Sequence, residues 1–321
     1  MRAVVAIAAE EPFSVLARLL AYGAYVRAAG TEVVVVTVSH DGSSGISTAA
    51  HSPAPDAPVI DISMLVPEPG DVVVFASPRV HHVMRAAYGA VGPDFIQLMA
   101  SARSVSAIGD HAYGFRLLEK PMVRIALSDR LAHEVVRLAG MPVELSVITP
   151  SLHLAPFSGG GLPPKQSGLA INAFDGDGTG LAADVAREAG FRGPVRVVND
   201  AMSVKGRAEV YRASAVALLA PRPGEGICQP ALEAAAAGCM IIITEGEAAA
   251  ALPDGVVPEA LVRRQRPREM ALAALRALDL PAGKRAEKAQ LGSSAALKAM
   301  GAAGEEARFM ELFDATISKS V

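Results

Sequence analysis

The chain has 321 residues, of which 51% are hydrophobic and 20% charged, and its formal net charge is −3 at pH 7. Because typical domains have roughly 100 to 200 residues, we expect two hydrophobic cores. Neither half carries the excess of lysine and arginine typical of nucleic-acid-binding proteins, so no nucleic-acid partner is expected. The N-terminus does not resemble a signal peptide, and no apolar run approaches the roughly 18 residues of a membrane span, which predicts a soluble cytoplasmic protein.

The cysteine content argues against structural sulfur chemistry. The chain contains Cys228 and Cys239 alone, without a CxxC motif or a neighbouring histidine pair. This pattern indicates neither a disulfide framework nor a zinc site. We expect both thiols to be reduced, with Cys239 as the stronger candidate for a buried position.

Strands and helices alternate along the first half of the chain. Short β-branched runs, which are typical of buried parallel strands, occur at 3–9, 32–38, 71–77, 95–101 and 122–128. Apolar residues three and four positions apart predict helices at 14–30, 79–92 and 129–140. This alternation predicts an open, parallel α/β sheet.

The alternation pauses and then resumes in the second half. The stretch 150–167 is dense in proline, glycine and serine, which predicts a linker between domains. Further buried strands are expected at 168–174, 195–199, 215–221 and 239–244. Helices are expected at 180–191, 207–214 and 229–238, followed by a helical region at 268–318.

We therefore predict an α/β fold with two doubly wound Rossmann-like domains that face each other across a cleft. The first domain spans 1–152 and the second spans 153–303. A C-terminal helix at 304–321 follows, with a return to the first domain as an open alternative. Phe309 and Phe313, with Leu312 between them, predict a packing stripe on that helix.

The segment RPGEGICQPALEAAAAG, residues 222–238, stands out chemically. It places Glu225 in a glycine turn after a predicted strand and Glu233 on the predicted helix that follows. The N–H groups and dipole at the start of that helix favour a phosphate. The two carboxylates suit hydroxyl donors on the same ligand. A phosphate flanked by polyols describes a nucleotide sugar, which we expect as the ligand.

The segment 205–255, with its two glutamates separated by seven residues, resembles the signature of the retaining, family 4 type glycosyltransferases of GT-B fold. Residues 122–157 are similar to the segment of this family that leads into its linker. The resemblance implies that Glu225 contacts hydroxyls of the transferred sugar and that Glu233 binds the ribose.

The resemblance also implies how the rest of the donor is held. Backbone amides of Gly226, Ile227 and Cys228 would hold the diphosphate or the sugar. The family's front-face mechanism, in which the leaving phosphate takes the acceptor proton, demands neither a metal nor another cofactor.

The chain departs from the family pattern around the diphosphate. Residues 9–14, AEEPFS, replace a Gly-Gly loop, and 173–180, AFDGDGTG, lack the expected arginine and lysine. Gly176 and Gly178 could build a nest of N–H donors for an anion, and an ordinary β-to-α turn is the alternative.

Several cations and histidines are further candidates. Lys205, Arg207 and Arg222 could supply the missing positive charge, with solvated side chains as the alternative. No histidine matches the catalytic one of the family's first domain. His111, expected in a glycine-flanked loop, is the substitute, with a surface or packing role as the alternative.

Two further groups carry expectations of their own. His81 and His82 are adjacent on a predicted helix and therefore point apart, so we expect one buried and one exposed histidine and no metal pair. A basic cluster could make a peripheral contact with anionic lipid, with plain surface as the alternative. It comprises Arg263, Arg264, Arg266 and Arg268.

The sequence thus predicts a glycosyltransferase that moves a sugar from a nucleoside diphosphate sugar to a hydroxyl acceptor with retention. One alternative is a non-catalytic relative that binds nucleotide sugars or partners an active transferase, and another is a sugar-nucleotide epimerase. A nicotinamide enzyme is disfavoured because the first strand runs into AEEP and not GxGxxG. The nucleotide base, the sugar, the acceptor and the oligomeric state are left open.

Overall fold

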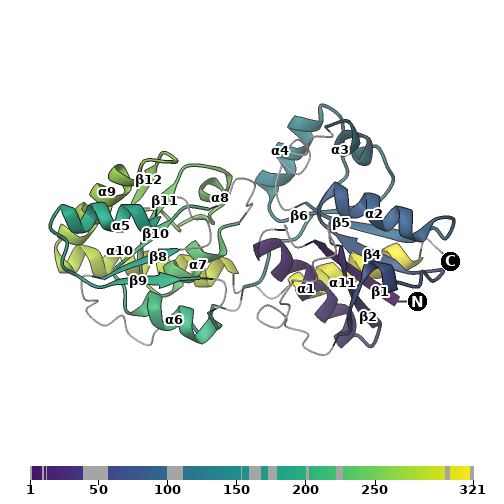
Figure 1. The fold of residues 1–321 in the computed structure, drawn as a ribbon, viewed down its shortest axis with the longest axis horizontal. Helices are drawn as coiled ribbons and strands as arrows, with labels where there is room; N and C mark the ends of the chain where they lie inside the picture. Colours follow the sequence, from purple (N-terminus) through teal and green to yellow (C-terminus); the bar gives the residue numbers. More distant parts are fainter. Residues whose placement is uncertain are drawn as a thin grey trace. The chain divides into compact units, whose positions relative to one another are not determined.

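The structure is a computed structural model, and Figure 1 shows its ribbon. It describes residues 2–8, 11, 13–38, 57–99, 111–152, 154–158, 168–172, 179–199, 202–221, 227–300 and 304–318. The chain divides into two compact units. The first consists of Met1–Pro150 together with Ala303–Val321, and the second is Ser151–Ala302.

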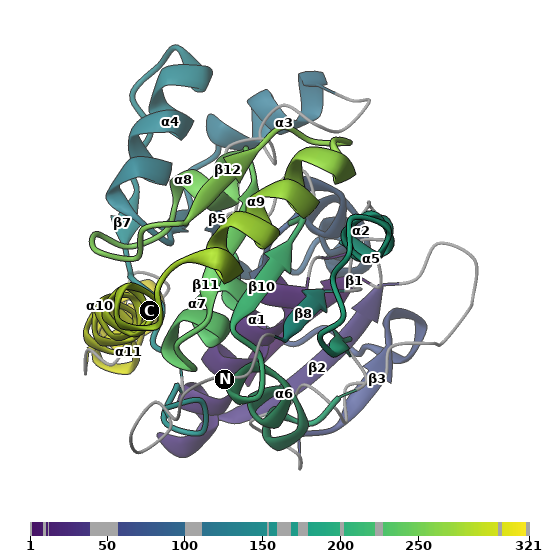
Figure 2. The ribbon, with the colours of Figure 1, turned by 90° about the vertical axis from the view of Figure 1, so that its left-hand side faces the viewer.

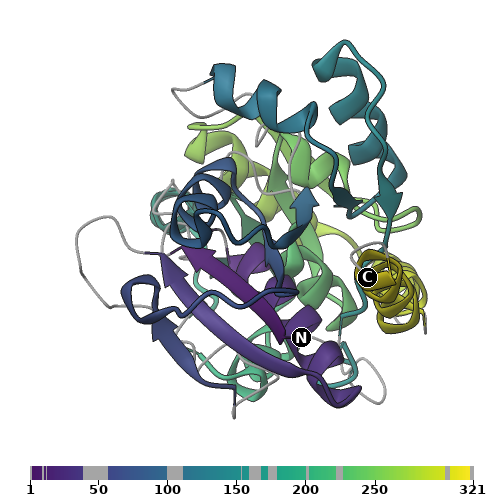
Figure 3. The same cartoon turned by 90° about the vertical axis from the view of Figure 1, so that its right-hand side faces the viewer.

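The first unit is built on a seven-stranded sheet whose paired neighbours are all parallel (Figure 3). Across the sheet the strands are β3 (Val59–Asp61), β2 (Glu32–Val38), β1 (Arg2–Ala8), β4 (Val72–Phe75), β5 (Asp94–Met99), β6 (Val123–Ala126) and β7 (Ser146–Val147). The order of the chain reverses between β1 and β4, as in a doubly wound sheet. All seven residues of β1 are buried, because helices cover both faces.

The helices of the first unit are α1 (Phe13–Ala28), α2 (Pro78–Tyr88), α3 (His111–Leu118), α4 (Asp129–Ala139) and α11 (Glu305–Ser318). A 3-10 helix, η2 (Ile62–Met64), follows β3. On one face of the sheet, Val80 and Met84 of α2 pack against Val73 and Phe75 of β4. Burying such side chains contributes roughly 1.5 to 3 kcal/mol each, which makes this cluster a principal source of stability.

The last helix, α11, belongs to the first unit although it follows the whole of the second in sequence, and Figure 1 shows it beside α1. Phe309 stacks on Tyr22 of α1 with ring centroids 4.1 Å apart. Arg18 of α1 donates to Glu305 Oε1 at 2.6 Å, and both side chains are buried. Stacked rings and a buried ion pair thus fasten the two helices together.

The second unit is built on a five-stranded sheet in which all paired strands are parallel (Figure 2). Across the sheet the strands are β12 (Ala260–Val262), β11 (Met240–Thr244), β10 (Val216–Leu219), β8 (Leu169–Asn172) and β9 (Val195–Val198). The order of the chain reverses between β8 and β10, which is where α/β sheets bind ligands at the carboxyl ends of their strands.

The helices of the second unit are α5 (Thr179–Glu188), α6 (Val204–Arg212), α7 (Gln229–Ala236), α8 (Glu247–Ala250), α9 (Pro267–Asp279) and α10 (Ala282–Met300). Helices α5 and α9 contribute to one hydrophobic core with the strands. Helix α7 contacts β10 and β11 and is in turn contacted by α6 and α10. All of α7 after Gln229 is buried, which explains its run of alanines beside the sheet.

The structure confirms the predicted α/β class with two parallel, doubly wound sheets. It differs from the sequence analysis in detail. Strands β3, β7 and β12 have two or three residues each and were not predicted, because such short runs show no period. The expected stripe is present, with Phe309 and Phe313 buried.

Candidate functional site

The carboxyl edge of the second sheet brings several polar side chains together around its switch point. Asn172 ends β8 and is buried. Thr244 ends β11 and is 5% exposed, and its hydroxyl oxygen has no hydrogen-bond partner among the described residues. The sequence analysis missed both residues because each was counted within an apolar strand.

The segment between β10 and α7 carries five of the predicted site residues. Arg222, Glu225 and Gly226 lie outside the described residues, and so do Gly176 and Gly178 of the turn after β8. The described chain resumes at Ile227, which is buried, and Cys228 precedes the first residue of α7. The backbone N–H of Gln229 donates to the Ile227 carbonyl at 3.0 Å. The start of α7 therefore lies at this edge, as the sequence predicts.

Glu233 lies on α7 in a buried ion pair. Its side chain is 2% exposed, and Arg207 of α6 holds it with two hydrogen bonds. Arg207 Nη2 donates to Oε1 at 2.9 Å, and Arg207 Nε donates to Oε2 at 3.0 Å. Gln229 Nε2 also donates to Oε1, at 3.0 Å. Glu233 is therefore not a solvated position on the helix surface.

This bidentate geometry fixes the carboxylate in space and balances its charge. Arg207 also donates from Nη1 to the Met202 carbonyl at 3.0 Å, which holds the guanidinium in place. The charge of Arg207 is therefore engaged by Glu233, whereas the sequence analysis considered it for a diphosphate. Nearby, burial raises the pKa of Tyr211 well above its usual value, with the Glu233 charge adding to the effect.

Lys205 and Arg264 are two further cations near this edge. Lys205 is exposed on the first turn of α6, as its solvated alternative expects, and the Ser203 hydroxyl caps that helix by accepting from the Gly206 N–H at 3.1 Å. Arg264 follows β12, and its Nη2 donates to the carbonyl of Pro221, just beyond β10. The sequence analysis grouped Arg264 with a surface cluster, yet the sheet order brings it beside the carboxyl end of β10.

The predicted histidines of the first unit have separate surroundings. Helix α3 begins at His111, so the expectation of a loop there is wrong, and the structure does not describe its side chain. His81 is buried between Phe75 and Phe95, with ring centroids 5.3 and 4.5 Å away, and His82 is exposed. Burial lowers the pKa of His81 to about 4, and the nearby Arg85 charge adds to the shift. The expectation of one buried and one exposed histidine is confirmed.

The described residues include both cysteines. Cys228 and Cys239 are both free thiols and both buried. Among the described residues no group of three histidine, cysteine or acidic side chains could hold a metal ion. In the same part of the chain no helix is long and apolar enough to cross a bilayer.

Comparison with known proteins shows the fold. No family model matches the sequence, and no curated protein matches it. A sucrose-phosphate synthase from Thermosynechococcus elongatus is 14% identical, with a TM-score of 0.67 over 99% of this chain and 100% of that one. HepE of Anabaena, solved with UDP and glucose, is 13% identical, with a TM-score of 0.68 over 99% of both chains.

A glycosyltransferase from Rickettsia africae is 10% identical, with a TM-score of 0.68 over 98% of both chains. These structures are GT-B glycosyltransferases, and each match spans nearly the whole of both chains. At such low identities the similarity concerns the arrangement of elements. The chain has the GT-B fold.

Proposed function

We propose that the protein is a glycosyltransferase that moves a sugar from a nucleoside diphosphate sugar to a hydroxyl acceptor with retention. The observation that carries this proposal is the fixed carboxylate of Glu233 beside the carboxyl edge of the second sheet, in a chain of GT-B fold. HepE, of similar fold, has been solved with UDP-glucose, which supports a nucleotide sugar as the ligand.

In this proposal Glu233 accepts a hydrogen bond from a hydroxyl of the ribose. Its Oε1 already accepts from Arg207 and Gln229, whereas Oε2 accepts from Arg207 alone among the described residues. A carboxylate oxygen has two lone pairs, so Oε2 retains one acceptor position. Arg207 holds that position still and offsets the charge that would otherwise repel the diphosphate.

The diphosphate would lie at the start of α7, where N–H groups and the helix dipole favour an anion. We propose that the amides of Gly226, Ile227 and Cys228 donate to it. Arg264, anchored on the Pro221 carbonyl, is well placed to add positive charge beside the same loop. Arg222, Lys205 and a nest at Gly176 and Gly178 are the further donors in this proposal.

Transfer with retention would follow a front-face course. The bond from the anomeric carbon to the diphosphate breaks, and the acceptor oxygen bonds to the same face of that carbon. The acceptor proton passes to the leaving phosphate oxygen, so the protein's part is to position both substrates and stabilise the leaving charge. Glu225 is the proposed contact to the hydroxyls of the transferred sugar. His111 is the proposed catalytic histidine of the first unit.

The test is incubation of the pure protein with radiolabelled UDP- and GDP-sugars, followed by assay of diphosphate release, with thermal shifts by UDP and GDP in parallel. We expect Glu225→Gln to lower kcat/KM about 10- to 100-fold, since a hydrogen bond to a charged group contributes roughly 1.5 to 3 kcal/mol. Glu209→Gln, an exposed position on α6, is the matched control and should leave the rate unchanged. An unchanged rate in Glu225→Gln would remove Glu225 from the site.

A second candidate is a non-catalytic relative that binds nucleotide sugars. The sequence departures at 9–14 and 173–180 favour it, and so does the lack of a histidine that matches the family position. Stabilisation by UDP or GDP without diphosphate release from any donor would support this candidate over the transferase.

A further inference from the structure

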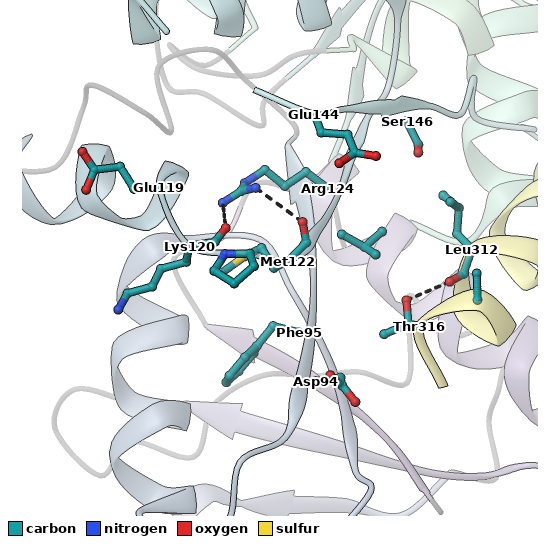
Figure 4. Close-up of a pocket in the computed structure, with 13 residues that line it drawn as sticks. Asp94, Phe95, Glu119, Lys120, Met122, Arg124, Glu144, Ser146, Leu312 and Thr316 are labelled. Atoms are coloured by element: carbon teal, nitrogen blue, oxygen red, sulfur yellow. Dashed lines mark hydrogen bonds between the residues drawn. The ribbon is translucent and has the colours of Figure 1, made fainter. Parts of the chain in front are cut away.

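A pocket of about 630 Å³ opens in the first unit, away from its carboxyl edge (Figure 4). It lies at the amino ends of β5, β6 and β7, and the last turns of α11 form one wall. Volumes of 300 to 1,000 Å³ are usual for small-molecule sites. The proposed nucleotide site uses the carboxyl edge of the other sheet, and none of its residues lines this pocket.

Arg124 of β6 forms the buried side of this pocket and is 4% exposed. Its Nη2 donates to the carbonyls of Leu117 at 2.6 Å and Lys120 at 2.8 Å, which caps the end of α3. Its Nε has no hydrogen-bond partner within the described chain, and no carboxylate there lies within ion-pair distance of it. A buried N–H without a partner destabilises the folded protein, so an added acceptor would stabilise this site.

Glu144 supplies the opposite charge without touching Arg124. Burial lowers the pKa of Arg124, and the nearby Glu144 charge acts in the opposite direction. Glu144 itself is exposed and lines the pocket together with Ser146. In Figure 4 the side chains of Glu119 and Lys120 extend away from Glu144, so they contribute little to this side of the pocket. The polar side of the pocket therefore offers an unpartnered donor and an acceptor.

The chemistry that satisfies both groups is a hydroxyl, because it accepts one hydrogen bond and donates another. A phosphate would meet the carboxylates of Asp94 and Glu144 on the lining, which disfavours an anion. The lining also includes the apolar side chains of Met122, Leu312 and Ala315, which suit the C–H face of a sugar ring.

We propose that this pocket binds a neutral saccharide, with a ring hydroxyl placed between Arg124 and Glu144. Leu312 and Ala315 of α11 pack against the ring. The site would hold a sugar chain on the first unit, and it does not depend on the proposed transfer reaction.

The test is saturation-transfer NMR of the full chain with a panel of glucose, galactose, maltotriose and cellotriose at millimolar concentration. We expect saturation of at least one of these sugars in the wild type. Ala315→Trp fills the pocket from an exposed helix position and should abolish the signal. Glu144→Gln should weaken binding on the order of 10-fold, because it loses a hydrogen bond to a charged group.

Glu119→Gln is the matched control and should bind the sugar as the wild type does. The absence of saturation with all four sugars would overturn the proposal, and so would undiminished binding by Ala315→Trp. A lower melting temperature of Glu144→Gln, together with no sugar binding by the wild type, would also overturn it. That result would make Glu144 a counterion that closes on Arg124.

Discussion

Each unit of the protein buries an arginine–glutamate pair, and the two pairs differ in what they join. Arg18 and Glu305 are 287 positions apart and fasten α11 to α1 in the first unit. Arg207 and Glu233 are 26 positions apart and connect the neighbouring helices α6 and α7 in the second. The first pair joins helices from opposite ends of the chain, whereas the second fixes the position of a carboxylate in the candidate site.

The surroundings of the two pairs show the same contrast. Glu305 also accepts from the hydroxyl of Tyr25 at 3.2 Å, and aromatic stacking of Tyr22 with Phe309 continues the contact along the two helices. Glu233 has Gln229 as its additional donor and keeps one acceptor position on Oε2. Buried pairs add little net stability relative to apolar residues, but loss of one partner is costly. Loss of one partner should therefore lower the stability of either unit. Apolar replacement of both partners should keep the fold in both units and should weaken UDP binding only when the second pair is replaced.

The largest effect is expected from Glu305→Ala, which leaves Arg18 buried without its carboxylate. A buried charge that loses its partner destabilises a protein by about 3 to 5 kcal/mol. We expect a loss of this size in urea unfolding followed by tyrosine fluorescence, with faster hydrogen exchange in α1 and α11. Glu306→Ala, at an exposed neighbouring position, should change stability by less than about 0.5 kcal/mol. Equal stability of these two variants would contradict the role of Glu305 as an anchor.

Apolar replacement of both partners should separate the two pairs. Arg18→Met with Glu305→Leu, and Arg207→Met with Glu233→Leu, should both keep the fold, since such exchanges are often neutral. The second double variant should bind UDP about 10- to 100-fold more weakly, through loss of roughly 1.5 to 3 kcal/mol. The first should bind UDP as the wild type does.

Isothermal titration calorimetry with UDP measures this difference, and circular dichroism shows that both double variants fold. If the two variants bind UDP equally well, Glu233 has no part in the nucleotide site. The arginine–glutamate pairs would then be equivalent structural devices in both units.

The sequence predicted the features of both units that local patterns determine. Alternating β-branched and helical periods gave both sheets, and the spacing of Glu225 and Glu233 drew attention to α7. The stripe on the last helix was also predicted, and Phe309 and Phe313 are buried. These features depend on residues close together in the chain, where periodicity is informative.

The partners of these residues could not be predicted, because pairing depends on tertiary distance. Arg18 is one of two charged residues on the apolar helix α1, and nothing local connects it to Glu305. Arg207 was considered as a cation for the ligand, but in the structure it forms an ion pair with Glu233. Arg264 was grouped with its sequence neighbours, and the order of β10, β11 and β12 decides its true position.

Acid should affect the first unit through His81. Its pKa is lowered to about 4 by burial, with Arg85 adding to the shift, whereas an unfolded histidine titrates near 6.5. The unfolded chain therefore binds more protons between these values. The contribution to stability is fully present above pH 6.5 and is lost as the pH falls through about 4.

We expect the free energy of unfolding to fall by on the order of 1 to 2 kcal/mol between pH 6.5 and 4.5, after allowance for screening. Urea unfolding at each pH measures this change. His81→Phe should flatten this dependence, and His82→Gln, on the exposed side of α2, should keep it. A pH profile unchanged by His81→Phe would show that another group controls acid stability in this unit.

The smallest expected effect compares helix caps in the two units. The Ser203 hydroxyl accepts from the Gly206 N–H at the start of α6, and the Ser128 hydroxyl accepts from the Leu131 N–H at the start of α4. Ser203→Ala and Ser128→Ala should each cost about 1 kcal/mol in thermal or urea unfolding.

Helix α6 carries Arg207 directly after its first turn, so fraying there loosens the support of Glu233. UDP affinity should therefore fall by up to about five-fold in Ser203→Ala, roughly 1 kcal/mol, and stay unchanged in Ser128→Ala. If Ser203→Ala and Ser128→Ala bind UDP equally well and lose equal stability, then the rigidity of α6 does not affect UDP binding.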